Sequence, residues 1–171
     1  MPADGRHSGA DEAPLFDVEV SESGEVRFTL PEPEQGDVLG EFLWVSSLGR
    51  GLGANDVGLD RGQLGQPRVV RFRRVGERVL LEAENLAYRA TGAGPDEARA
   101  TEQSFATSVL WSGEVASRSS RSVTFDASSL IVRDAHGVAA SLRRAGQGDF
   151  TRAEERSGVQ PELCVALPHN V

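Results

Sequence analysis

Apolar and polar side chains alternate with a period of two in short runs along most of the chain. Residues 15–20 and 25–30 alternate in this way around the turn-like segment 21–24, which is the pattern of a β-hairpin with one solvated face. Pro31 then ends the second run. Further strands are expected at 42–48, 68–74, 79–83, 85–89, 109–115, 123–125 and 162–167.

Helical patterns are few and short. Pro95, followed at once by carboxylates, is a suitable first-turn residue and predicts a helix over 95–106. After Phe125 the period changes, and Asp126 can cap one or two short helices broken near Gly137. The pattern therefore predicts a mainly β domain, either an antiparallel sandwich or a curved sheet, with two or three short helices.

The segment 49–65 is unusually rich in glycine and separates two strand-like runs. Such a density suits a chain that must reach positive φ or let another backbone approach closely. The loop could bind an anion, a divalent cation or a partner peptide. The residues expected to bind substrate or partner are Asn55, Asp56, Asp60, Arg61 and Gln63.

Two interpretations of this loop stay open. Asn55, Asp56 and Asp60 offer oxygen ligands of the kind calcium prefers, but their spacing is not that of an EF-hand loop and no glutamate closes the site. The alternative is a long, self-bonded connection in which Asn55 and Asp56 hold turns and Arg61 pairs with a carboxylate. The self-bonded connection is the favoured interpretation, and because long ordered loops are functional more often than short ones, a contribution to a substrate cleft stays open as well.

Length and charge narrow the class of protein. The 171 residues suit one domain, expected at 14–171 after a disordered N-terminal tail at 1–13. The formal net charge of −8 argues against nucleic acid as a partner, because phosphate binding needs a concentrated basic face. Every basic side chain is arginine, which indicates a GC-rich genome. Cys164 is the single cysteine, so it can form neither an intrachain disulfide nor a thiolate metal site.

The sequence also predicts where the protein works. The N-terminus lacks the basic start and apolar run of a signal peptide, and no segment approaches the roughly 18 apolar residues that span a bilayer. We therefore expect a cytoplasmic protein with no membrane partner.

The remaining candidate residues favour structure over chemistry. His136 could act as a ligand or base with Asp126 or Glu102, but metal sites normally need three or four protein ligands, so a hydrogen-bonded structural role is favoured. No catalytic residue, metal site or cofactor is assigned within this chain. Trp44 and Trp111 are expected to anchor the core. The solvated side of a hairpin is expected to carry an arginine series, at Arg68, Arg71, Arg73, Arg74 and Arg78.

Several segments, in order, resemble the N-terminal region of large bacterial zinc-dependent metallopeptidases of the gluzincin type. The glycine-rich run 51–65 is the most specific of them. The resemblance extends from about Leu15 onward and includes Phe42–Val45, Ser104–Trp111, Arg133–Val138, Leu142, Arg143, Arg156, Ser157 and Pro168–Asn170.

The resemblance implies a noncatalytic β-rich domain that precedes the catalytic domain. In that family an H-E-x-x-H helix and a downstream glutamate, both in a later domain, hold the zinc. This chain has no H-E-x-x-H, and it ends where the family continues into another strand, so it looks like a truncated domain. The implied partner is the catalytic domain. The alternative is an independent protein- or peptide-binding β module that acts by strand addition, for which an open strand edge also predicts self-association.

Overall fold

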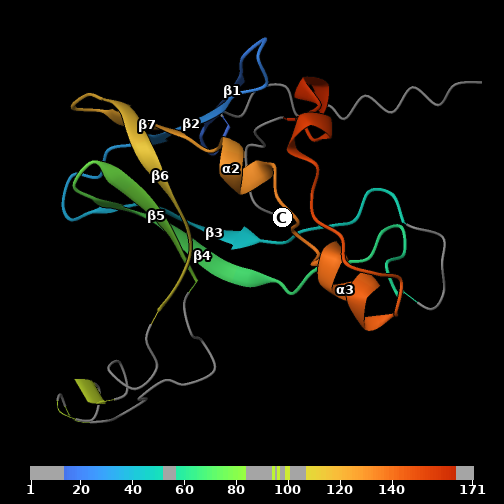
Figure 1. Ribbon diagram of the computed structural model, residues 1–171. Coiled ribbons are helices and arrows are strands. Elements are labelled where there is room, and N and C mark those ends of the chain that lie inside the picture. Colours follow the sequence, from blue (N-terminus) through green and yellow to red (C-terminus); the bar gives the residue numbers. More distant parts are fainter. Residues whose placement is uncertain are drawn as a thin grey trace, which may run out of the picture.

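The computed structural model describes residues 14–51, 57–83, 94, 96, 99–100 and 107–164. Seven antiparallel strands form one curled, half-barrel sheet in the order β1-β2-β7-β6-β5-β4-β3 (Figure 1). This confirms a mainly β fold and selects the curved sheet over the sandwich. The strands are β1 (Asp17–Val20), β2 (Val26–Pro31), β3 (Val38–Trp44), β4 (Arg68–Val75), β5 (Arg78–Ala83), β6 (Ser108–Arg118) and β7 (Ser122–Asp126).

Two short α-helices follow the sheet, α2 (Ser128–Ile131) and α3 (Val138–Arg144). Asp126 precedes α2 as expected, and its Oδ1 accepts a hydrogen bond from the Ser128 N–H at 2.8 Å. Gly137, with φ +63°, separates the two helices, as the sequence predicts. Two 3-10 turns complete the described chain, η1 (Glu154–Arg156) and η2 (Pro161–Leu163).

The prediction of a strand at 162–167 is wrong for its first residues, which belong to the 3-10 turn η2. Pro161 occupies the first turn of η2, so the chain curls there instead of extending. The remainder of that segment, the expected strand at 85–89 and the N-terminal tail at 1–13 lie outside the described residues. Within the expected helix at 95–106, the described residues Asp96, Arg99 and Ala100 are helical.

The core lies on the concave face of the sheet, as the alternating pattern requires. In β4, Val70 and Phe72 are buried while Arg71 and Arg73 occupy the opposite face. The Phe72 ring lies at the centre, 5.3–6.3 Å between centroids from three other phenylalanine rings that belong to β2, β3 and β7. The core cluster consists of Val26, Phe28, Leu30, Leu39, Val70, Phe72, Val79, Leu81, Ala83, Val123, Phe125, Ala127 and Leu130.

Both tryptophans pack against this core from partly buried positions. The Trp111 ring lies 5.9 Å from the Phe125 ring, and its indole Nε1–H donates to Ser129 Oγ at 2.8 Å. This hydrogen bond satisfies the indole and ties β6 to α2.

The convex face carries a buried ionic cluster. Glu82 is only 2% exposed, and its carboxylate accepts hydrogen bonds from Arg71 Nε and Arg73 Nε, each at 3.0 Å. The hydrogen bond from Arg73 is the largest cause of the lowered pKa of Glu82, and Arg71 adds to it. Two of the arginines expected on the solvated side of a hairpin are thus engaged within the sheet itself.

A second acidic residue fastens the connection between β2 and β3. Glu32 accepts hydrogen bonds from Arg118 Nε at 3.2 Å and Arg74 Nη2 at 3.3 Å, which joins this connection to β6 and β4. The hydrogen bond from Arg118 holds the pKa of Glu32 below its usual value.

Gly113 in β6 provides a test of the close packing on the concave face. A Cβ at this position would lie 2.3 Å from the Trp111 ring and 2.6 Å from the carbonyl oxygen of Asp126. We expect Gly113→Ala to lower the free energy of unfolding by about 1–3 kcal/mol, since the backbone carbonyl cannot move aside alone. Urea unfolding measures the change. Gly49→Ala is the control, because a Cβ at Gly49 meets nothing within 4 Å; an equal loss in both variants would contradict the packing explanation.

Candidate functional site

The described part of the glycine-rich loop closes on itself at the end of the β3–β4 hairpin. The Leu48 N–H donates to Gln63 O at 2.9 Å, and the Gly62 N–H donates back to Leu48 O at 2.8 Å. The Gly65 N–H donates to Ser46 O at 2.7 Å. Leu59 anchors the loop with an exposed fraction of 3%. The loop is therefore an ordered extension of the hairpin on both sides of 52–56, which lie outside the described residues.

The structure places three of the five residues expected to bind substrate or partner. Gln63 holds a turn, because its Oε1 accepts the Asp60 N–H at 3.2 Å. Asp60 and Arg61 line an open cavity of about 460 Å³ with residues 49–51. Asn55 and Asp56 lie outside the described residues.

Gly51 explains part of the glycine content of this loop. A Cβ at Gly51 would lie 2.6 Å from the Arg61 backbone nitrogen and 2.8 Å from the Leu59 carbonyl oxygen. The two arms of the loop thus approach so closely that a side chain at this position would not fit.

Helix α3 lies beside this loop (Figure 1). Asp134 lies three residues before Gly137 and caps the start of this helix. Its Oδ1 accepts a hydrogen bond from the Val138 N–H at 2.7 Å, and its Oδ2 accepts one from the Ala139 N–H at 3.1 Å. These bonds satisfy two of the N–H groups that a helix leaves unpaired at its start.

A polar cavity of about 460 Å³ separates the loop from α3. His136 is one of the residues that line it, and His136 Nε2 is buried without a hydrogen-bond partner among the described residues. The sequence pattern does not predict this juxtaposition. The loop contributes Val57, Gly58, Leu59 and Gln63, and the region of α3 contributes His136, Ser141, Arg144 and Ala145.

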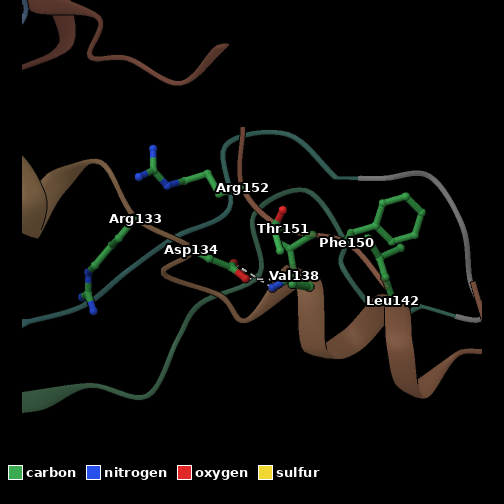
Figure 2. Close-up of a pocket in the computed structure, with 8 residues that line it drawn as sticks. Arg133, Asp134, Val138, Leu142, Phe150, Thr151 and Arg152 are labelled. Carbon is green, nitrogen blue, oxygen red and sulfur yellow. Dashed lines mark hydrogen bonds between the residues drawn. The ribbon is translucent and has the colours of Figure 1, made fainter. Parts of the chain in front are cut away.

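An apolar pocket of about 390 Å³ lies on another side of α3 (Figure 2). Figure 2 shows Phe150 beside Leu142 at one end of this pocket and Arg133 and Arg152 toward the other. The Phe150 side chain is 49% exposed, and α3 has no fully buried residue. The helix thus presents an apolar side here and a polar side to the glycine-rich loop.

The position of α3 depends on Asp134, which gives a testable prediction. We expect Asp134→Ala to lower the free energy of unfolding by about 1 kcal/mol and to speed hydrogen exchange at the amides of α3. Asp134→Asn should retain most of the protection, because an amide oxygen also accepts a hydrogen bond. Asp149→Ala is the control, since Asp149 is highly exposed and pairs with Arg143. Unchanged exchange at Leu142 in the alanine variant would contradict this role.

The described residues give little support for a metal site, a reactive thiol or a membrane-spanning helix. Among residues 14–51, 57–83, 94, 96, 99–100 and 107–164, no group of three or more His, Cys, Asp or Glu residues could hold a metal ion. Burial raises the pKa of the Cys164 thiol. No helix in this part of the chain is long and apolar enough to cross a membrane.

The described residues form a half-barrel β domain in which the glycine-rich loop between β3 and β4 faces the short helix α3 across a polar cavity. Residues 62–171 match the model of a family described as Domain of unknown function (DUF5117), and the chain belongs to that family. No curated protein and no solved structure matches the chain.

Proposed function

We propose that this domain is the noncatalytic N-terminal module of a bacterial zinc-dependent metallopeptidase of the gluzincin type. The module orients the catalytic domain, and its glycine-rich loop lines the substrate groove. The zinc belongs to the catalytic domain, where an H-E-x-x-H helix would hold it.

One observation carries the proposal: segments that resemble the peptidase family and lie far apart in the sequence meet at one end of the molecule. The run 51–65 contributes four residues to the polar cavity, and the segment Arg133–Val138 contributes His136. Trp44, Gly65 and Arg133, from three such segments, line a neighbouring cavity of about 230 Å³. Because these residues form a surface with cavities, a shared docking and substrate role explains their association better than core packing does.

The coding DNA downstream of Val171 tests the proposed parentage. We expect the reading frame to continue past Val171 and to encode an H-E-x-x-H motif. When that domain is added to this one, hydrogen exchange should slow at the glycine-rich loop and α3 and stay unchanged in the β1–β2 turn. A frame that ends without the motif would overturn the proposal.

A second candidate function is recognition of an extended peptide by strand addition. Strands β1 and β3 stand at the two ends of the strand order, and strands in that position can accept another strand. Size-exclusion chromatography with light scattering tests this function. Concentration-dependent dimers or a stable peptide complex would support it, whereas a monomer that binds no peptide would exclude it.

A further inference from the structure

We propose that the polar cavity between the glycine-rich loop and α3 binds an oxyanion, the carboxylate or phosphate group of a ligand. This inference concerns the isolated domain and does not depend on the proposed parentage.

The cavity offers several hydrogen-bond donors to an anion. Arg144 is fixed along α3, because its Nε donates to Ala140 O at 3.3 Å and its Nη2 to Ser141 Oγ at 3.2 Å. Within the described chain its Nη1 makes no hydrogen bond, so this group can donate to a ligand. Ser141 Oγ accepts from Arg144, so its O–H can donate, and Gln63 Oε1 accepts the Asp60 N–H, so its amide NH₂ can donate.

The charge of the described cavity wall also favours an anion. None of the described residues that line the cavity is acidic, although the whole chain carries a formal charge of −8. The nearest carboxylate in sequence to His136, that of Asp134, already accepts two backbone N–H groups of α3. Among the described lining residues an anion therefore meets a guanidinium and no competing carboxylate, and charge-assisted hydrogen bonds to arginine are the strong ones.

His136 has a ring nitrogen without a hydrogen-bond partner in the described chain. Its Nε2 is shielded from solvent and has no hydrogen-bond partner within the described chain, yet the residue forms part of the cavity wall. Buried polar atoms in proteins are almost always paired, and one without a partner is a group whose hydrogen bond a ligand can complete.

The cavity is large enough for an oxyanion that belongs to a larger ligand as well as for a free ion. A volume of about 460 Å³ falls within the range of small-molecule sites, roughly 300–1,000 Å³. The same oxyanion chemistry could come from an acidic peptide side chain or from a free phosphate. The experiment distinguishes these two sources.

The test is a titration of the ¹⁵N-labelled full chain, followed by amide chemical shifts at constant ionic strength. One arm adds sodium phosphate, the second adds N-acetylated, amidated tetraglutamate, and sodium chloride is the salt control. We expect saturable shifts at Gly58, Gln63 and Ser141 with at least one probe. The probe that binds more tightly identifies the source of the oxyanion.

Two neighbouring arginines give a matched pair of variants. Arg144→Gln should weaken binding about tenfold or more, since a hydrogen bond to a charged group is lost. Arg143→Gln should leave affinity within about twofold, because Arg143 pairs with Asp149 and is not part of the cavity wall. His136→Gln should also weaken binding. Absence of saturable shifts with both probes, or equal losses in the two arginine variants, would overturn the proposal, and neither result bears on the proposed parentage.

Discussion

Replacing Phe72 with alanine should lower the free energy of unfolding by about 3–5 kcal/mol, the range for a fully buried phenylalanine. Phe72 is 2% exposed, and its ring contacts the rings of Phe28, Phe42 and Phe125. These rings come from separate strands, so the substitution removes the contacts that hold β2 and β7 against β3 and β4. Urea unfolding followed by circular dichroism measures the loss.

Two further variants show whether the loss comes from burial. Phe72→Leu should cost less than the alanine variant, because leucine refills part of the volume. Phe150→Ala removes the same ring from a side chain that is 49% exposed and should change stability by less than about 1 kcal/mol. Equal effects at Phe72 and Phe150 would contradict the assignment of the core to the concave face.

Replacing Glu82 with alanine should lower the free energy of unfolding by about 2–4 kcal/mol, because it removes the charge-assisted hydrogen bonds that Arg71 and Arg73 donate to this buried carboxylate. Without Glu82, the Arg73 guanidinium would still form its ion pair with Asp37, whose Oδ2 is 3.5 Å from Arg73 Nη1. The matched control is Glu114→Ala, where the carboxylate is 83% exposed and pairs with Arg78 at 3.5 Å. That change should cost less than about 1 kcal/mol.

The same carboxylate predicts how stability depends on pH. Its folded-state pKa is lowered from 4.5, chiefly by the hydrogen bond from Arg73, so the ionised form is favoured in the folded protein. The resulting stabilisation is present above pH 4.5 and is lost as the pH falls through the lower folded-state pKa. Glu82→Gln should therefore flatten the acid limb of a stability–pH curve. An unchanged acid limb would contradict the buried pairing.

Local patterning was enough to predict most strands of the sheet, although β3 spans Val38–Trp44 and not the expected 42–48. Residues such as Val70 and Phe72 alternate with Arg71 and Arg73, and a period of two leaves only one buried face. The direction in which the sheet curls was not predictable, because it depends on contacts between rings whose strands are distant in sequence, such as Phe28 and Phe72. The 3-10 turn at Pro161–Leu163 escaped prediction since its apolar residues also fit a strand.

The candidate site was only half predictable. Glycine density marked the loop, and Gly51 confirms that a close backbone approach requires it. The sequence did not predict the opposite wall of the cavity. His136 and Arg144 line it only because the fold brings α3 next to the loop. Arg144 follows Arg143 in the sequence, and nothing in that pair reveals which guanidinium reaches the cavity.

We propose that this domain supports a peptidase without performing its chemistry. The most direct measurement is the rate at which the purified chain cleaves casein, first with chelator and then with added zinc. We predict that zinc will not raise the rate above that of the chelated sample. Cleavage that chelator abolishes and zinc restores would contradict the account.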